Sequence, residues 1–270
     1  MTEALLNNER CFLEQKAWKS VLRSIISDDA LISDRSEIVI ELMILKSNIP
    51  GLCVDVTKIV LHDDSNRPFI NAIACKIHQL RVDLLAWHTN YEALLSQAPT
   101  IYPGSAEYER RCKVFATYLS CLIISSRLLG AISPTERVEL EEETQVLAGQ
   151  MLDLELEVKS ASSAACLFMA QTLGVAQATI ATSRDWLDGE QALAKRGSVS
   201  TGSVSTESAY TASISTESAY TGSLSTHSSR DSSYTGSVSP TASEGKSEQR
   251  VVIDAWKFEN WNKACGRKIS

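Results

Sequence analysis

The amino-acid composition changes abruptly near Lys195, and this change limits how much of the chain can fold around a core. Of the 47 residues from 197 to 243, 25 are Ser or Thr, and large apolar residues are nearly absent. Residues 201–210 recur with small changes as residues 211–220, and each repeat has one aliphatic side chain and one Tyr. So few apolar groups cannot offset an ordering cost of about 1–2 kcal/mol per residue. We therefore predict a disordered Ser/Thr-rich linker over residues 196–246, with a stacked β-structure of repeats as the alternative.

Residues 1–195 have the opposite character, because their apolar residues recur at helical spacing and alternation typical of strands is scarce. A segment of this length can bury a proper core without metal ions or disulfides. The sequence therefore predicts an all-α fold in which residues 1–195 form a multi-helix array.

Local signals divide this array into six or seven helices. We expect them at residues 8–26, 37–45, 68–95, 105–129, 134–158, 161–173 and 175–194. Asp34 is expected to cap the second helix, which ends before Pro50, and Gly174 is expected to separate the last two. The segment Ser133-Pro134-Thr135-Glu136 is the clearest start signal, because it combines a capping box with Pro in the first turn. The apolar face of the first helix consists of Phe12, Leu13, Ala17, Val21, Leu22 and Ile25.

The end of the chain, residues 247–270, predicts one more amphipathic helix. Its apolar side contains Val251, Ala255, Phe258, Trp261 and Cys265, and Gly266 follows as a C-cap. Arg267 and Lys268 are basic residues of the kind that a helix C-terminus favours. Because this short piece contains both Trp256 and Trp261, we expect it to dock on the body or on a partner.

The charge balance argues against a protein that binds nucleic acid mainly by electrostatic attraction. The net charge is -7, and residues 1–195 have 18 basic and 26 acidic side chains. The densest basic patch, Arg110-Arg111-x-Lys113, has the acidic neighbours Glu107 and Glu109. Direct contact with DNA phosphates is therefore not expected from this part of the chain.

The first residues, the cysteines and the apolar runs predict a chain that is neither secreted nor inserted in a membrane. The first ten residues lack the basic and apolar regions of a secretory signal, and the seven cysteines are widely spaced. We expect reduced, mostly buried thiols rather than a disulfide framework. Residues 160–183 have no charged side chain, but their Gln, Ser and Thr content favours a buried helix pair over a membrane span.

The residue types that carry catalysis or bind metals do not form a known constellation. His62-Asp63-Asp64 is interpreted as a solvated turn, and His78 and His88 are interpreted as satisfied or surface histidines. Glu141-Glu142-Glu143 is interpreted as a charge run on an exposed helix face. Trp18, Trp87 and Trp186 are expected to be core anchors. No P-loop, G-x-S-x-G or G-x-G-x-x-G segment occurs. We therefore predict no catalytic, cofactor-binding or metal-binding residues, and a protein that is not an enzyme.

Several segments together resemble the C-terminal regulatory region of fungal zinc-cluster transcription factors. The likeness spans most of residues 9–270 outside the Ser/Thr-rich segment. The most telling segments are Arg127-Leu-Leu-Gly-Ala-Ile-Ser-Pro134 with Glu139-Leu-Glu141, Val175-Ala-x-Ala178-Thr-x-Ala-Thr182-x3-Trp186, and Phe258-x2-Trp261-x4-Gly266-Arg-Lys268. Weaker matches are Phe12-Leu13-x4-Trp18-Lys19-x-Val21-Leu22, Asp34-Arg35, Ala86-Trp87-x3-Tyr91-Glu92 and the stretch from Tyr118.

The resemblance implies a nuclear protein that regulates transcription, with control of a secondary-metabolite gene cluster as a further expectation. It implies other transcription-regulatory proteins, and self-association, as the contacts made by the helical region. The family's C-x2-C-x6-C zinc cluster has no counterpart here, so its zinc ligands and DNA-contacting residues cannot be mapped. The alternative is a helical accessory or biosynthetic protein that does not bind DNA; adhesion or assembly through the repeats is a third hypothesis.

Overall fold

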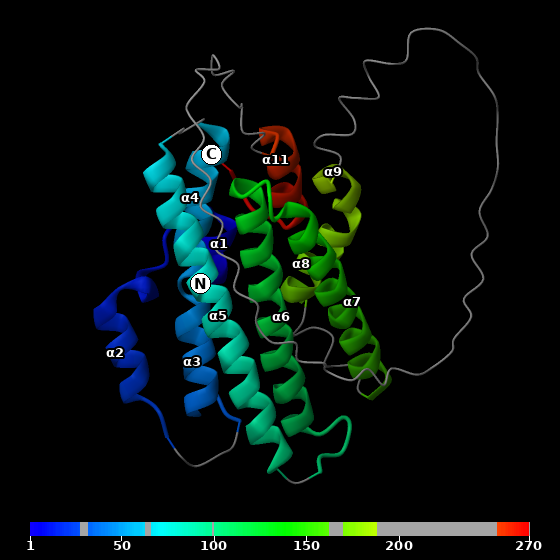
Figure 1. Cartoon of the computed structure of the whole chain (residues 1–270). Coiled ribbons are helices and arrows are strands. Elements are labelled where there is room, and N and C mark those ends of the chain that lie inside the picture. The colour runs from blue at the N-terminus through cyan, green and yellow to red at the C-terminus, as the bar shows by residue number, and fades with distance from the viewer. Residues whose placement is uncertain (28–31, 63–65, 99, 162–169, 188–252, 270) are drawn as a thin grey trace, which may run out of the picture. The chain divides into compact units, whose positions relative to one another are not determined.

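The computed structural model describes residues 1–27, 32–62, 66–98, 100–161, 170–187 and 253–269 (Figure 1). Within these ranges the secondary structure is helical and contains no strand, so the predicted all-α class is confirmed. The helices belong to one unit of the chain, residues 1–195 together with 250–270. The predicted linker and its repeats lie outside the described residues.

Helix α6 (Ala106–Ile132) forms the centre of this unit. It packs against α4 (Ile49–Leu61), α5 (Arg67–Ser96), α7 (Arg137–Ala161) and α8 (Ala170–Ala181). Every residue of α6 from 118 to 132 is buried, as expected for a helix that is apolar on all sides. Among the described helices it alone is long and apolar enough to cross a membrane, but 89% of its most apolar stretch is buried inside the molecule. Because core helices also pass this test, the match is weak evidence for a span.

Helices α3 (Glu37–Lys46) and α5 follow the predicted boundaries closely. The side chain of Asn66 accepts a hydrogen bond from the Phe69 N–H and caps α5, which places Pro68 in the first turn, where no N–H is needed. The buried side chains of α5 recur every three or four residues: Ile70, Ile73, Ile77, Leu80, Leu84, Trp87 and Tyr91. The predicted cap of α3 at Asp34 is wrong. Asp34 lies in the preceding turn, and Ser36 is the N-cap residue.

Helix α4 is an element that the sequence patterns did not predict. It begins at Ile49, and Pro50 occupies its first turn. Pro50 therefore starts a helix, although it was interpreted only as the end of the preceding one. Ten of the thirteen residues of α4 are buried, which makes it a core helix.

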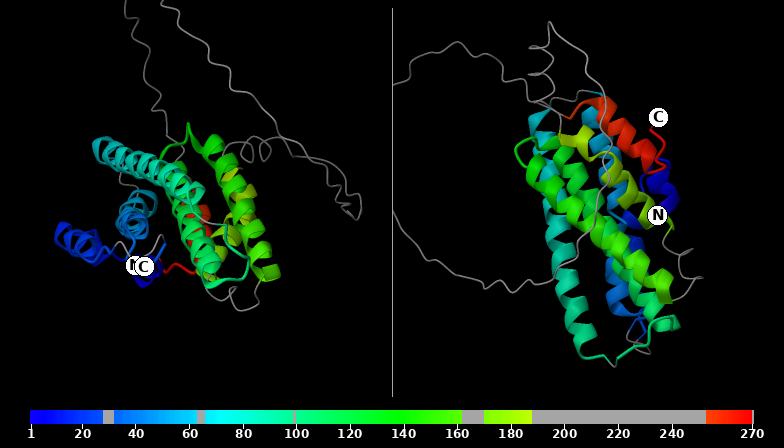
Figure 2. Two further views of the ribbon diagram at one scale, coloured as in Figure 1. Left: turned by 90° about the horizontal axis from the view of Figure 1, so that it is seen from below. Right: turned by 90° about the vertical axis from the view of Figure 1, so that its right-hand side faces the viewer.

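The predicted helix over residues 8–26 is wrong in extent. The chain instead forms α1 (Thr2–Leu6), the 3-10 turn η1 (Phe12–Glu14) and α2 (Lys16–Ser24). Asn8 has a φ of 55°, a left-handed conformation that ends the first segment. Figures 1 and 2 show α2 at the outer edge of the unit, beside α3.

Helix α7 begins three residues after its predicted start at Pro134, directly after the predicted capping box. The Ser133 hydroxyl donates to the Glu136 carboxylate at 2.9 Å, and the helix starts at Arg137. Helix α8 runs through Gly174, so the predicted division at that residue is wrong. The short helix α9 (Ser183–Leu187) follows it. The predicted helices over 161–173 and 175–194 extend in part outside the described residues.

Helix α11 (Ala255–Ala264) packs against α8 and α4, and thus closes the same core that residues 1–187 form. Phe258 and Trp261 of the predicted apolar side are fully buried, and Gly266 has a φ of 76°, which confirms the predicted C-cap. The helix begins at Ala255 after its N-cap Asp254, and Val251 of the predicted side lies outside the described residues. Phe69 and Leu61 of earlier helices also pack onto this core. Figure 2 shows the red C-terminal segment reaching the blue N-terminal segment. The Lys268 N–H donates to the Leu6 carbonyl, which joins the two ends.

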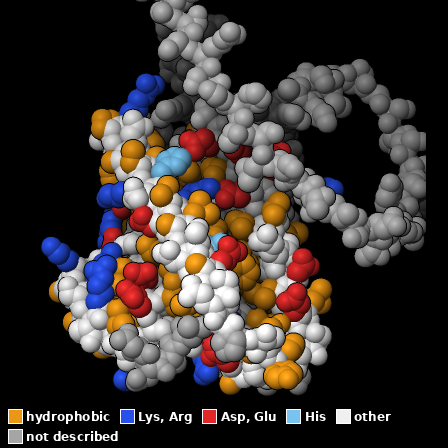
Figure 3. Space-filling view, turned by 60° about the horizontal axis from the view of Figure 1, so that its bottom comes forward, with side chains coloured by type: hydrophobic (Ala, Val, Ile, Leu, Met, Phe, Trp, Pro, Cys, Tyr) orange, Lys and Arg blue, Asp and Glu red, His pale blue; other side chains and the backbone are white. Residues whose placement is uncertain are grey.

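The surface contains apolar and charged side chains in mixture. On the face shown in Figure 3, hydrophobic side chains lie between acidic ones, and basic side chains gather toward the left edge. Because Figure 3 is turned about the horizontal axis, this edge is the side where α2 lies in Figure 1.

Candidate functional site

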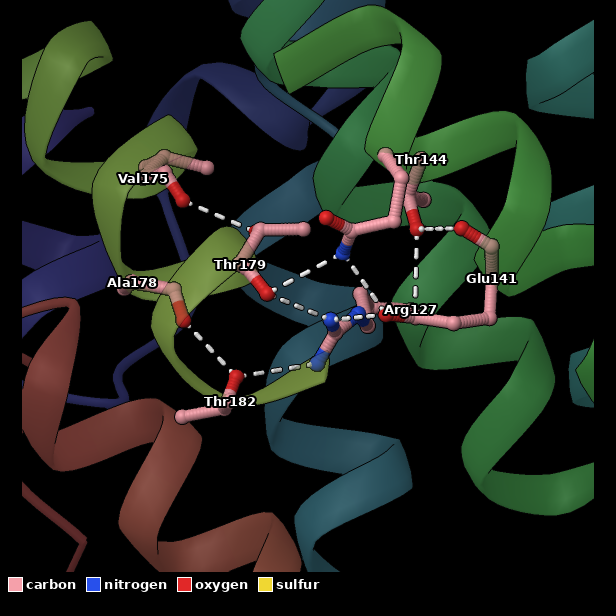
Figure 4. Close-up of polar contacts among 8 residues, drawn as sticks. Arg127, Glu141, Thr144, Val175, Ala178, Thr179 and Thr182 are labelled. Atoms are coloured by element: carbon pink, nitrogen blue, oxygen red, sulfur yellow. Dashed lines mark hydrogen bonds and ion pairs between the residues drawn. The ribbon is translucent and has the colours of Figure 1, made fainter. Parts of the chain in front are cut away.

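A buried ion pair between α6 and α7 lies at the heart of the described unit (Figure 4). The Arg127 Nη2 atom is 2.6 Å from Glu141 Oε1, and the two side chains are 0% and 1% exposed. Position 127 is the lone charged residue in a run of α6 from 114 to 132 that is otherwise apolar or hydroxylated. A charged group that is fully buried is tolerated only when hydrogen bonds and a counter-ion replace the water that it has lost.

The C-terminal end of α8 supplies further partners for Arg127. The Arg127 Nη2 atom donates to the Thr179 carbonyl at 2.9 Å. The Arg127 Nη1 atom donates at 3.2 Å to the hydroxyl of Thr182, the residue that follows α8. The last carbonyls of a helix have no partner inside the helix and bear partial negative charge. The guanidinium therefore both satisfies the Thr179 carbonyl and neutralises the end of α8.

Glu141 is held by donors from its own helix. The Gln145 amide donates to Oε1 at 2.8 Å, and the Thr144 hydroxyl lies 3.1 Å from Oε2. Gln145 also donates to the Thr179 carbonyl at 3.2 Å, so it links α7 to α8 directly. The carboxylate and the guanidinium thus share partners in one network.

Two tryptophans cover the guanidinium. Its Cζ atom lies 4.3 Å from the Trp186 ring centroid and 5.8 Å from that of Trp261. The two indoles meet edge to face with centroids 5.6 Å apart, a favourable geometry for their quadrupoles. The Trp186 indole packs close to α6, because a Cβ atom at Gly130 would lie 3.4 Å from its Nε1 atom. We call Arg127, Glu141, Gln145, Thr179, Thr182, Trp186 and Trp261 the arginine cluster.

Burial perturbs both charges of the pair. Desolvation lowers the pKa of Arg127 to about 10, while the nearby Glu141 opposes this shift. Desolvation also raises the pKa of Glu141, against the effects of Arg127 and the hydrogen bonds that the carboxylate accepts. Arg127 remains protonated at neutral pH, because its lowered pKa still lies well above 7, so its contacts with Glu141 and the other partners have to offset the cost of burying its charge.

Hydrogen bonds link Glu141 to Arg127 and Gln145 and link both of these to the Thr179 carbonyl, but not every polar atom of the arginine cluster has a partner. Among the described residues, the buried side-chain atoms without a hydrogen-bond partner are Arg127 Nε and Trp261 Nε1. A surface hollow of about 250 Å³ lies elsewhere, between α2, α3 and α5, and Trp87 and Asp83 are among its lining residues. The arginine cluster connects residues of α6, α7, α8, α9 and α11. Its contacts are of the kind that stabilise the packing of helices against one another.

The structure corrects two interpretations of single residues. Glu141 is not on an exposed face with Glu142 and Glu143, because only Glu142 is exposed and Glu143 forms a 2.6 Å ion pair with Arg81. The period of α7 turns Glu141 toward α6, which a run of three glutamates does not reveal. Trp18 is not a core anchor, because it is 44% exposed.

Trp87 and Trp186 are buried, as predicted. The Trp87 Nε1 atom donates to the Ile38 carbonyl at 2.7 Å, which ties α5 to α3. Six of the seven cysteines lie in the described part of the chain; all six are free, and Cys75 is exposed.

The histidines of the described residues, which are the side chains best suited to catalysis or metal binding, do not belong to the arginine cluster. His78 lies 3.4 Å from Glu136, and His88 stacks on Tyr118 with ring centroids 4.6 Å apart. Asp63 and Asp64 lie outside the described residues, and His62 ends α4. Within the described residues, no three His, Cys, Asp or Glu side chains lie together as the ligands of a metal ion would.

The basic patch on α6 is neutralised within its own helix. Glu107 pairs with Arg110 at 3.1 Å and with Arg111 at 3.3 Å. These contacts confirm that the acidic neighbours weaken the patch.

The C-terminal segment contains another buried arginine, Arg267, that the sequence did not predict as buried. Arg267 was interpreted as a cation near a helix end, but its Nε donates to the Leu5 carbonyl at 3.0 Å and its Nη2 donates to Asn8 Oδ1 at 2.9 Å. Its Nη1 also donates to Asn262 Oδ1. Arg267 therefore fastens α11 to the N-terminal segment.

The arginine cluster could not be predicted from spacing, because its members extend from residue 127 to residue 261. The one available signal was the set of segments that carry the family resemblance, which contains Arg127, Glu141, Thr182, Trp186 and Trp261. No protein-family model matches the chain, and none of the curated proteins or solved structures compared with it matches either.

Proposed function

We propose that this chain is a transcriptional regulator of the fungal zinc-cluster factor type that acts in the nucleus through its helical unit. The observation that carries the proposal is the arginine cluster. The segments that resemble the family's regulatory region are far apart in the sequence, yet Arg127, Glu141, Thr182, Trp186 and Trp261 meet at one buried point. Such convergence is what a shared folding core requires, which favours a common architecture over a chance likeness.

The proposed mode of action is contact with other transcription-regulatory proteins, self-association included, without direct reading of DNA. The acidic balance of residues 1–195 and the pairing of Arg110 and Arg111 with Glu107 disfavour contact with phosphates. We propose no catalysis, no cofactor and no membrane span for this role. Genes of a secondary-metabolite cluster are the proposed targets.

Transcript sequencing after deletion of the gene tests this proposal. We expect a defined set of transcripts to change, and the full chain fused to a fluorescent protein to restore them and accumulate in the nucleus. A matched chain carrying Trp256→Ala, at an exposed position of α11, should restore them equally. A protein confined to the cytosol, whose loss leaves transcript levels unchanged, would contradict the proposal.

One observation favours the second candidate, a helical accessory or biosynthetic protein. The hollow between α2, α3 and α5 brings Arg23, Glu41, Asp83 and Asn90 to one opening of about 250 Å³. Opposite charges around an opening of this size could bind a small polar molecule. A turnover activity of the protein that Asp83→Asn abolishes would favour this candidate over the regulator.

A further inference from the structure

Helix α2 presents its apolar side to solvent. None of its residues is buried, although its apolar residues fall on one face. Lys19 and Leu22 are the half-buried members, and the Lys19 ammonium donates to the Asn48 side chain at 2.7 Å, beside the start of α4. The helix therefore rests on the unit partly through a basic side chain and leaves most of its apolar face uncovered.

The uncovered face is large for so short an element. Trp18, Val21 and Ile25 are 44%, 49% and 44% exposed, at the spacing of one helix face. Phe12 is 56% exposed and packs edge to face on Trp18, with centroids 5.2 Å apart. We call Phe12, Trp18, Val21 and Ile25 the α2 face. An exposed aromatic pair with aliphatic neighbours at positions i+3 and i+7 is the pattern by which a helix binds an apolar groove.

The charge on α2 is of one sign. Residues 15–27 contain Lys16, Lys19 and Arg23 and no acidic residue, whereas residues 1–195 as a whole have an excess of acid. None of these three cations forms an ion pair within the described residues. Figure 3 shows basic side chains gathered at the edge on which α2 lies. The partner of this helix must therefore be apolar at its centre and acidic at its rim.

We infer that the α2 face docks into the acidic, methionine-lined groove that a calcium-loaded EF-hand pair of the calmodulin type presents. Such a groove receives basic amphipathic helices through apolar anchors spaced i, i+3, i+4 and i+7, and the exposed Trp18, Val21 and Ile25 occupy the i, i+3 and i+7 positions. The inference goes beyond the proposed role in transcription and does not depend on it.

Two other occupants of the α2 face fit less well. Two copies of α2 packed face to face would bring like charges together, because each has only basic charges. An anionic membrane would attract the three cations but would repel the acidic remainder of residues 1–195. A compact acidic groove brings no second basic helix into contact with α2, and because it can cover α2 alone it meets less of the acidic remainder than a membrane does.

Titration of the full-length protein with calmodulin tests the inference. In calcium we expect a complex with a Kd of roughly 1 µM or tighter, and we expect chelation of calcium to abolish it. Trp18→Ala should weaken binding by about tenfold or more, as loss of a central aromatic anchor does. Arg23→Glu paired with Lys16→Glu should weaken it to a similar extent.

Trp256→Ala is the matched control, because Trp256 is a 59% exposed tryptophan on α11. It should bind calmodulin as the unchanged protein does, and circular dichroism should show equal helicity in all the variants. Absence of binding at about 100 µM calmodulin, or binding that Trp18→Ala leaves unchanged, would overturn the inference. Binding to phosphatidylserine vesicles or self-association that needs Trp18, without calmodulin binding, would overturn it as well.

Discussion

Breaking the ion pair of Arg127 and Glu141 should cost far more stability than breaking an exposed pair among the described residues. Glu141→Gln keeps the shape of the side chain but leaves the Arg127 charge buried without its counter-ion. We expect this change to lower the free energy of unfolding by about 3–5 kcal/mol, measured by urea unfolding. The control is Glu107→Gln at a partly exposed pair, where about 0.5 kcal/mol is expected. Equal losses in the two variants would contradict the buried, charged state of the pair.

A double variant distinguishes the cost of an unpaired buried charge from the cost of losing the whole hydrogen-bond network. Replacement of both partners, as Arg127→Met with Glu141→Leu, removes both desolvation penalties along with the attraction. The double variant should therefore be more stable than Glu141→Gln, because apolar side chains of similar volume can fill a buried site. If the double variant is the less stable one, the network rather than the charge sets the cost.

The two tryptophans of α11 offer a contrast between neighbours on one helix. Trp261 is fully buried against Trp186, whereas Trp256 is exposed. We expect Trp261→Ala to cost about 3–5 kcal/mol of unfolding free energy and Trp256→Ala less than about 0.5 kcal/mol. Urea titrations of both variants provide the measurement. A similar cost at both positions would mean that α11 does not dock through Trp261.

At the scale of the helices, the sequence predicts the ends of those helices that are capped by adjacent residues. Asn66 and Ser105 cap α5 and α6 through their own side chains, close to the predicted starts. Gly266 ends the C-terminal segment as its pattern indicated. Caps and turns depend on a few adjacent residues, so the sequence around them carries the information.

The errors arose where distant parts of the chain decide the outcome. The orientation of Glu141 depends on Arg127, and the exposure of Trp18 depends on how little of the unit covers α2. Burial of a side chain is a property of the tertiary arrangement, which periodicity along one helix does not contain. For this reason the sequence does not predict the contacts of the arginine cluster, although five of its residues belong to the segments that carry the family resemblance.

Gly174 gives a direct test at the scale of one helix. It lies inside α8 with no positive φ, and a Cβ atom added there would have no neighbour within 4 Å. Gly174→Ala should therefore raise the free energy of unfolding by about 0.5–1 kcal/mol through helix propensity. Gly149→Ala in α7 has equal space and should act alike in urea unfolding. A loss of stability on Gly174→Ala alone would restore the helix break that the sequence predicted.

For the whole molecule, the buried thiols and phenols predict destabilisation at alkaline pH. Burial raises the pKa of Cys121 to about 11 and those of Cys265 and Tyr118 to about 12. Because these folded values exceed the unfolded ones, their contribution is complete below the unfolded pKa, about 8.5 for the thiols and about 10 for Tyr118, and is lost as the pH rises through the folded pKa values. Each such group lowers the unfolding free energy by about 1.4 kcal/mol per pH unit in that window.

Urea midpoints between pH 7.5 and 10.5 measure this loss. Above pH 9, Cys121→Ala should reduce the slope of the unfolding free energy against pH by about 1.4 kcal/mol per pH unit, which corresponds to one proton. This change in slope does not depend on how the substitution affects stability at neutral pH. Arg127 acts in the opposite direction only above about pH 10, because burial lowers its pKa to about that value. A slope that Cys121→Ala leaves unchanged would contradict the burial of this thiol.

The central structural claim is that α11 belongs to the same folded body as residues 1–187, through the arginine cluster and Arg267. Hydrogen exchange of the full chain, followed by mass spectrometry, tests it most directly. A helix of ten residues is marginal on its own, so its amides are protected only if it docks. We predict that residues 256–264 exchange as slowly as the core of α6, and that Trp261→Ala removes this protection first. Exchange of α11 at the rate of an unstructured peptide in the unchanged protein would contradict the claim.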